Sequence, residues 1–217
     1  MSVTELQSKL EFTLPYGHLE VVSVPGYEGI KLALINRDFP IGPLPQNVMN
    51  AVIKDPAYWA FCWGSGVALA RYLRRHTGIV SGLRVLDLGS GSGVVAIAAL
   101  LNGAKLVVAC DTDPNARLAI KVNADINNVA IATTGNASGH FDIALLADVL
   151  YDPCNQDVLD ETLGLADTVL VADSRVKHTP RGFRHIESMS ARTFPNLGEF
   201  DEFRTVKLFR WDRFANA

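Results

Sequence analysis

Val85-Leu86-Asp87-Leu88-Gly89-Ser90-Gly91-Ser92-Gly93 carries the clearest structural signal in the chain. The mostly apolar segment from Leu83 to Leu88 predicts a buried strand, and the glycines that follow it predict a turn. Residues 94–101 are an unbroken run of small and aliphatic side chains, long enough for a helix packed against a sheet. Strand, glycine turn and helix form the opening unit of a doubly wound α/β domain, which binds ligands at the carboxyl ends of its strands.

The spacing of the glycines indicates what kind of ligand this turn suits. Gly89, Gly91 and Gly93 give G-x-G-x-G, whereas a dinucleotide fingerprint requires G-x-G-x-x-G and a P-loop requires a lysine after its last glycine. Asp87 lies two residues before the first glycine, and a carboxylate there suits a positively charged ligand better than a pyrophosphate. The spacing therefore argues against both phosphate-binding motifs, while an ordinary strand-turn-helix unit without a ligand stays open.

Beyond the glycine turn the sequence alternates between strand and helix patterns. We expect helices over residues 114–127 and 155–165, and strands over residues 106–110, 129–134, 141–147 and 168–172. Near the end of the sequence, residues 200–203 and 206–211 predict a terminal β-ribbon. This alternation predicts an α/β fold with a doubly wound, mostly parallel sheet of seven strands.

Residues 1–50 differ in pattern from the rest and are predicted to form an N-terminal extension, with the main domain in residues 51–217. Residues 19–24 and 30–35 have the character of short strands, and Pro25-Gly26 between them predicts a turn. We therefore expect a β-ribbon, which could serve as a lid, as a docking surface or as a structural strap over the core.

Two further segments allow more than one interpretation. A helical pattern from Ala57 to His76 is interrupted by Trp63-Gly64-Ser65-Gly66, which we interpret as a turn with a second helix from about Val67. Trp63 then lies either at the edge of a cleft or in the core. Residues 173–185 form a basic stretch before an expected helix, and this stretch is either a docking site for an acidic partner or a solvated face.

Polar residues at the strand ends are the candidate ligand contacts. Asp111 ends the strand 106–110 and follows Gly89 by 22 residues, where an acid can accept hydrogen bonds from ribose hydroxyls. Asp113, with Pro114 next to it, is better explained as a helix N-cap. Asn136 suits either a contact with an adenine edge or an ordinary turn.

Composition limits the class of protein. The chain has 217 residues, of which 48% are hydrophobic, and a formal net charge of −3, so we expect a globular domain and not a non-specific nucleic-acid binder. Its three cysteines lack metal-ligand spacing, so we expect no metal site and a cytoplasmic location; they are Cys62, Cys110 and Cys154. Neither a signal peptide nor an apolar run of 18 residues is present, so no membrane association is expected.

The glycine motif Asp87-Leu88-Gly89-Ser90-Gly91-Ser92-Gly93 resembles the first motif of class I methyltransferases, which use S-adenosylmethionine. That cofactor carries an ammonium and a sulfonium and has no phosphate. Asp148-Val149-Leu150-Tyr151 lacks the Pro-Pro pair usual in the amino-methyltransferases of nucleic acids and of glutamine, and resembles the D-x-x-Y motif of seven-strand protein lysine methyltransferases. Residues 59–73 and 85–98 are most similar to the electron transfer flavoprotein β-subunit lysine methyltransferases, within a match of roughly residues 55–155.

This resemblance implies a site and a reaction. Asp148 and Tyr151 would face the target lysine of a flavoprotein subunit, and Asp148 would orient the amine while its proton leaves to water. The residues expected to line the S-adenosylmethionine site, and to hold S-adenosylhomocysteine as the product, are Trp63, Asp87, Gly89, Ser90, Gly91, Asp111, Asn136 and Ala147.

Other functions remain open at this point. A methyltransferase for a small amine fits the same motifs, and so does a catalytically inactive cofactor-binding protein that serves as a partner subunit. A nicotinamide dehydrogenase is less favoured because the third glycine is displaced. Nucleic-acid methylation is disfavoured by the acidic charge balance and by the missing prolines. The sequence predicts neither the target lysine, nor the number of methyl groups added, nor the oligomeric state.

Overall fold

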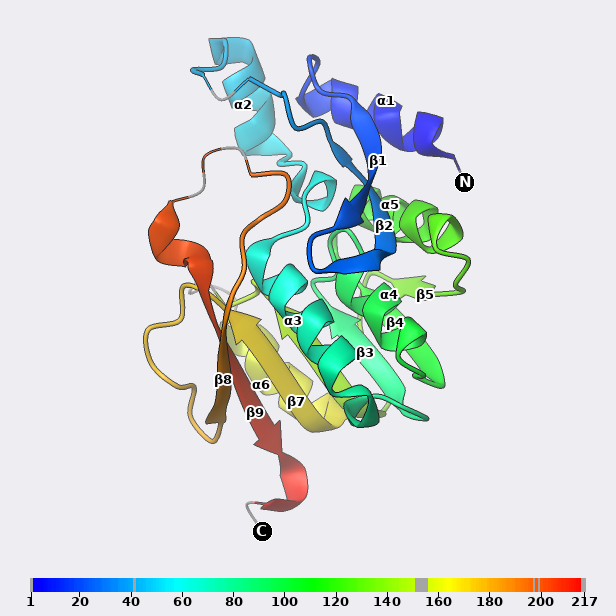
Figure 1. Cartoon of the computed structure of the whole chain (residues 1–217), viewed down its shortest axis with the longest axis vertical. Coiled ribbons are helices and arrows are strands. Elements are labelled where there is room, and N and C mark those ends of the chain that lie inside the picture. Colours follow the sequence, from blue (N-terminus) through cyan, green and yellow to red (C-terminus); the bar gives the residue numbers. More distant parts are fainter. Residues whose placement is uncertain (1, 41, 151–155, 197, 199, 216–217) are drawn as a thin grey trace.

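A computed structural model describes residues 2–40, 42–150, 156–196, 198 and 200–215 (Figure 1). Among them, seven strands form one sheet in the order β5-β4-β3-β6-β7-β9-β8. The five strands from β5 to β7 run parallel, and β9 joins antiparallel to both β7 and β8. The strands are β3 Arg84–Leu88, β4 Leu106–Cys110, β5 Ala132–Thr134, β6 Phe141–Ala147, β7 Ala166–Asp173, β8 Arg184–Ser190 and β9 Thr205–Asp212. The expected doubly wound α/β fold is confirmed.

Helices cover both faces of this sheet, which explains why its central strands are apolar on both sides. Alternate residues of β7 enter different cores: Leu170 packs with the side that carries α3 and α4, whereas Val169 packs with Leu159 of α6. Figure 1 shows α3 and α4 in front of the sheet and α6 behind it. The helices of the main body are α3 Gly64–Arg75, α4 Val94–Leu101, α5 Pro114–Ile126 and α6 Gln156–Leu165.

The N-terminal β-ribbon is present and is fastened to the body of the protein. Strands β1 (Leu19–Val24) and β2 (Tyr27–Ile35) pair antiparallel as a separate two-stranded sheet. Buried Asn123 of α5 accepts a hydrogen bond from the Ala33 backbone N–H at 2.8 Å and donates one to the Ser92 carbonyl at 2.8 Å. Of the three roles considered for the ribbon, these contacts support that of a structural strap. The domain boundary at residue 50 stays a prediction.

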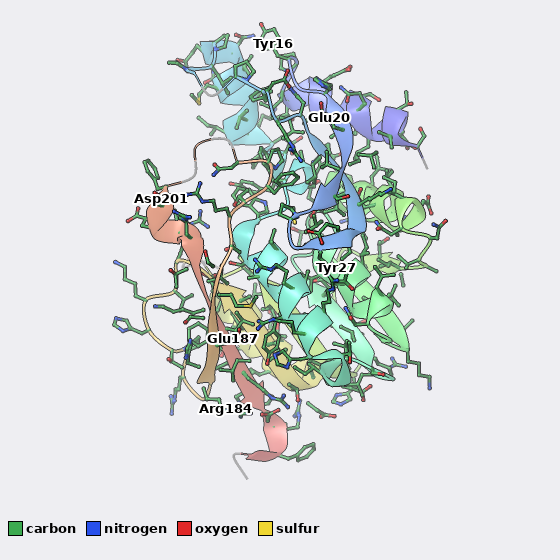
Figure 2. All side chains as sticks on the ribbon, viewed as in Figure 1. Tyr16, Glu20, Tyr27, Arg184, Glu187 and Asp201 are labelled. Atoms are coloured by element: carbon green, nitrogen blue, oxygen red, sulfur yellow. The ribbon has the colours of Figure 1, made fainter. Side chains whose placement is uncertain are left out.

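Side-chain contacts at the other end of the ribbon reinforce this attachment. Tyr27, labelled in Figure 2, accepts a hydrogen bond from Asn102 at the end of α4 at 3.0 Å. The guanidinium carbon of Arg74, in α3, lies 5.0 Å from the centre of the Tyr27 ring, within the range of a cation–π contact. The ribbon therefore packs on α3 and α4 as well as on α5.

Two N-terminal helices were not expected from the sequence. Helix α1 (Val3–Thr13) buries Leu6 and Leu10, and helix α2 (Gln46–Lys54) buries Val48. Among the described residues, no helix has the length and apolar character needed to cross a membrane.

The start of α3 differs from the prediction. The expected helix from Ala57 is only a 3₁₀ turn at Tyr58–Ala60, and α3 begins at Gly64, three residues before the predicted Val67. The early start is possible because the Asp148 side chain accepts hydrogen bonds from Ser65 in the first helical turn.

The C-terminal region also requires two corrections. The basic stretch 173–185 leads into strand β8 and not into a helix. The strand expected at residues 200–203 is absent, since Asp201–Arg204 form a 3₁₀ turn and β8 is the true partner of β9. Glu187 of β8 pairs with Arg75 of α3 at 2.7 Å, which ties the edge strand to the helical layer (Figure 2).

Candidate active site

Two adjoining cavities lie at the carboxyl ends of β3, β4 and β6. The first has a volume of about 440 Å³ and the second about 390 Å³, each within the range of small-molecule sites. Gly89, Asp111, Thr112 and Val149 line both cavities, so the two form one continuous cleft. This is the edge of the sheet where a doubly wound fold places its ligands.

The glycine turn forms one wall of the cleft. Gly91 donates its backbone N–H to the Asp111 carboxylate at 2.8 Å and has a φ of +53°, in the left-handed region that favours glycine. A Cβ added at Gly91 would meet no protein atom within 4 Å, and the residue lines the first cavity. A Cβ at Gly89 would instead lie 2.8 Å from Val149. The absence of side chains here keeps the cavity open.

Asp87 and Ser90 lie beneath the turn and do not line either cavity. The Asp87 carboxylate is 1% exposed and accepts hydrogen bonds from the Ser90 hydroxyl at 2.5 Å and from the Ala96 N–H at 3.0 Å. Burial raises the pKa of Asp87 to about 7, against the opposing effect of these two hydrogen bonds. Asp87 therefore supports the turn and the first turn of α4 from below.

Asp111 lies at the junction of the two cavities. One of its carboxylate oxygens accepts the Gly91 N–H at 2.8 Å, and the other accepts the Asp113 N–H at 3.0 Å. Each carboxylate oxygen retains a further lone pair, so Asp111 can still accept hydrogen bonds from ligand hydroxyls. Asp113 caps α5 through the Asn115 N–H at 2.7 Å, as predicted.

The second cavity is lined mainly by apolar side chains. Asn136 lies in its wall, as the sequence suggested, and the neighbouring surface is mostly apolar. The apolar lining comes from Leu88, Ala137, Val149, Val158 and Leu165.

Asp148 lies in the wall of the first cavity, directly after β6. Its side chain is 8% exposed, and its two oxygens accept the Ser65 N–H at 3.0 Å and the Ser65 hydroxyl at 2.6 Å. Burial and the nearby Asp173 carboxylate raise the pKa of Asp148 to about 6, although the Ser65 hydrogen bonds and the Arg175 guanidinium act in the opposite direction. Asp148 is a non-glycine residue with positive φ, +52°, a backbone strain that is common at functional sites. Tyr151 lies outside the described residues.

Aromatic side chains border the first cavity. Trp63 is partly exposed there, donates its indole N–H to the Tyr58 carbonyl at 2.9 Å, and packs edge-on against the Tyr58 ring. Of the two positions considered for Trp63, the structure matches the one at the edge of the cleft. Ala147, also expected at the site, lines the same cavity.

Sequence reasoning missed Ser65, Tyr58 and Arg175. Ser65 was assigned to a turn before the expected helix, and its role depends on a contact with Asp148 that is distant in the sequence. Arg175 was treated as part of a basic surface stretch, although it follows β7 by two residues and so belongs to the cleft edge of the sheet.

This arrangement suits a ligand with three different parts. The apolar second cavity offers space for an aromatic base, and Asp111 offers acceptors for hydroxyl groups. The first cavity joins an open glycine turn to a carboxylate at Asp148, next to which a cationic or amine group can bind.

Comparisons with known proteins agree with this geometry. Residues 68–156 match the family model of ribosomal protein L11 methyltransferase (PrmA). The electron transfer flavoprotein beta subunit lysine methyltransferase of Danio rerio is 46% identical over 115 residues, covering 50% of this chain and 44% of that protein. The Homo sapiens protein of the same name is 41% identical over 116 residues, covering 51% of this chain and 44% of that protein. The chain thus matches less than half the length of these curated relatives.

Solved structures identify the fold. Magnesium protoporphyrin IX methyltransferase from Synechocystis PCC 6803, with bound SAM, superposes with a TM-score of 0.52 at 16% identity and covers 80% of this chain and 88% of its own. A ribosomal protein L11 methylase from Lactobacillus delbrueckii subsp. bulgaricus reaches 0.50 at 24% identity, covering 67% of this chain and 77% of its own. The chain therefore has the class I methyltransferase fold and resembles, over half of its length, the electron transfer flavoprotein β-subunit lysine methyltransferases.

Proposed function

We propose that this protein is an S-adenosylmethionine-dependent protein-lysine N-methyltransferase whose substrate resembles the electron transfer flavoprotein β-subunit. The observation that carries the proposal is a single cleft with the glycine turn and Asp111 on one side and Asp148 on the other. The names of the most similar relatives support lysine and a flavoprotein subunit, and the name of the matching family model supports a protein substrate. We also propose a cytoplasmic protein without nucleic-acid or membrane partners. The net charge of −3 argues against non-specific nucleic-acid binding, and the scattered cysteines without metal-ligand spacing support a reducing compartment.

The residues of the cleft fit S-adenosylmethionine, part by part. The second cavity, with Asn136, would hold the adenine, and Asp111 would accept the ribose hydroxyls. The first cavity would hold the methionine part between the glycine turn and Trp63. When bound, the cofactor supplies a methyl group on a sulfonium, which makes the sulfur a good leaving group.

The chain itself must position an acceptor amine and allow it to be neutral. A free lysine has a pKa of about 10.4, so most of it carries a proton at neutral pH and has no lone pair to react. Desolvation in the cleft favours the neutral amine, and Asp148 can accept a hydrogen bond from it. Because Ser65 fixes both oxygens of Asp148, the carboxylate has one orientation in which to hold the amine. The proton of the amine leaves to water.

A methyl-transfer assay tests the proposal. The protein is incubated with tritium-labelled S-adenosylmethionine and either purified electron transfer flavoprotein or a cell extract. We expect one labelled protein of the size of the β-subunit, with the label on lysine. Asp148→Asn keeps the shape of the side chain and removes its charge, and should lower turnover by about 100-fold, as expected for a lost positioning group.

Asp160→Asn is the matched control, since Asp160 is exposed on α6 and does not line the cleft. It should transfer label like the wild type. Label confined to small molecules would refute the protein substrate, and near-normal turnover by Asp148→Asn would refute the role of Asp148. Binding of S-adenosylhomocysteine without transfer to any acceptor would indicate an inactive cofactor-binding protein instead.

A further inference from the structure

Arg175 lies at the point where the cleft meets a second groove. This groove has a volume of about 370 Å³ and is lined chiefly by aromatic side chains and proline, among them Phe61, Phe200 and Phe203. Within the described part of the chain, Trp63 and Arg175 are the residues that line both the groove and the first cavity. Arg175 therefore lies where the groove and the cavity that contains Asp148 adjoin.

The backbone at Arg175 is held by a buried carboxylate. Asp173, at the end of β7, is 0% exposed, and one of its oxygens accepts the Arg175 N–H at 2.7 Å and the Val176 N–H at 3.1 Å. On the other side of the loop, Lys207 of β9 donates to the Val176 carbonyl at 3.2 Å. The start of the loop thus has a defined position relative to the sheet.

The Arg175 side chain is oriented as well. Its guanidinium carbon lies 4.5 Å from the centre of the Phe203 ring, and one of its terminal nitrogens lies 3.8 Å from an Asp148 oxygen. An arginine keeps its positive charge at any pH that a protein tolerates. The first cavity therefore contains a permanent cation next to its carboxylate.

This pairing bears on the protonation of the acceptor amine. A carboxylate alone stabilises the ammonium form, which cannot react, whereas a neighbouring cation disfavours it. Lysines next to another cationic group are known to become neutral more easily for this reason. We propose that Arg175 is a further residue of the reaction, which offsets the negative charge of Asp148 so that the acceptor amine can be present without its proton. This inference rests on the proposed function.

Other charged groups surround this pair and must stay constant in a test. Asp173 and Arg175 flank Asp148 from the β7 side, and the buried Cys62 thiol lies on the α3 side, where burial and Asp148 raise its pKa. Across the cavity are Asp111 and Asp113, and beyond Phe203 the exposed Asp201 pairs with Arg192 and Arg204. A substitution of Arg175 leaves the other groups in place and raises the pKa of Asp148, which affects the acid limb of the pH profile and not the amine limb.

The test is the pH dependence of kcat for the full chain between pH 6 and 10.5, measured at saturating substrate, because kcat reports the ionisations of the enzyme–substrate complex. Arg175→Gln removes the charge, Arg175→Lys retains it, and Arg181→Gln removes one charge from an exposed position outside the cleft. At an effective dielectric constant of about 20, a unit charge about 6–12 Å from the amine moves its pKa by about one to two units. The amine limb of the Arg175→Gln profile should move up by that amount, with a loss of kcat of about 10- to 100-fold at pH 7.5 that diminishes as the pH approaches 10.5.

Several outcomes separate the inference from its alternatives. In Arg175→Lys and Arg181→Gln the amine limb of the pH profile should lie at the same pH as in the wild type. All variants should bind S-adenosylhomocysteine with wild-type affinity by calorimetry. An Arg175→Gln profile that is lowered equally at every pH would overturn the inference in favour of a structural role, and so would an equal shift in Arg181→Gln. If the wild type transfers methyl groups and either of these two results is found, this inference alone is refuted. If the wild type transfers methyl groups to no amine, the proposed function and the inference are refuted together.

Discussion

Gly91→Ala separates the role of the glycine turn in folding from its role in binding, because the chain offers a matched control. Gly91 and Gly82 both have positive φ, +53° and +75°, and an added Cβ would meet no protein atom within 4 Å at either position. Gly91 lines the first cavity, whereas Gly82 lies in an exposed turn just before β3, at the opposite end of that strand. The two substitutions therefore strain the backbone alike, and only one places a methyl group in the cleft.

The expected magnitudes follow from this comparison. A left-handed alanine costs about 1–2 kcal/mol, so each variant should lose about that much free energy of unfolding. In a domain of this size a loss of 1 kcal/mol lowers Tm by about 2–4 °C. In Gly91→Ala the new methyl group also overpacks the ligand, which costs about 1–3 kcal/mol and raises Kd by about 5- to 150-fold.

Urea denaturation gives the free energy of unfolding, and calorimetric titration with S-adenosylhomocysteine gives Kd. We expect both variants to be destabilised to a similar extent, with weaker binding in Gly91→Ala alone. Binding by Gly91→Ala with the wild-type Kd would show that the ligand does not approach this glycine. Equally weakened binding in Gly82→Ala would show that backbone strain anywhere near β3 is sufficient, and the reasoning would fail.

Two further predictions concern buried polar groups. Asp87 has a folded-state pKa of about 7, above its value of about 3.9 in an unfolded chain, so ionising it costs stability above pH 7 and the cost is relieved as the pH falls toward 4. In urea denaturation at pH 8, 6 and 4.5, the free energy of unfolding of Asp87→Asn, relative to that of the wild type, should therefore be highest at pH 8 and should fall as the pH is lowered. A constant difference between the two proteins at all three pH values would contradict the assignment. Asn123→Leu leaves the buried Ala33 N–H and Ser92 carbonyl without their partner and should cost about 3 kcal/mol or more. Asn127→Ala, which loses exposed hydrogen bonds to Lys31, should cost about 1 kcal/mol, and similar losses in both variants would refute this account of the strap.

The parallel core could be predicted closely from the sequence because its strands are buried on both faces. Such strands appear as continuous apolar runs with sharp ends, so the expected segments 106–110 and 141–147 coincide with β4 and β6. The helix expected over residues 94–101 likewise coincides with α4. Topology then placed Asp111 and Asp148 at the same edge of the sheet, because the carboxyl ends of parallel strands lie together.

The elements that were missed depend on partners far away in the sequence. Helix α1 has a weak apolar periodicity, and helix α2, although amphipathic, is only nine residues long and follows the proline-rich segment directly, with Pro45 as its N-cap. Strand β8 is mostly exposed or half-exposed and becomes a strand by pairing with β9. The start of α3 depends on the contact between Ser65 and Asp148, which are 83 residues apart. The helix propensity of the residues around Ser65 does not predict that contact.

The contact between Ser65 and Asp148 links the fold to the proposed chemistry. At the N-terminus of α3 the carboxylate satisfies a helix N–H group, and the helix dipole stabilises its negative charge. Burial and Asp173 oppose ionisation, and the resulting pKa of about 6 leaves Asp148 ionised above neutral pH. Much of this negative charge is then balanced by the helix terminus and by Arg175. The carboxylate can therefore orient an amine by a hydrogen bond while holding its ammonium form less strongly than an isolated acid would, and an acceptor that must lose a proton before it reacts requires this combination.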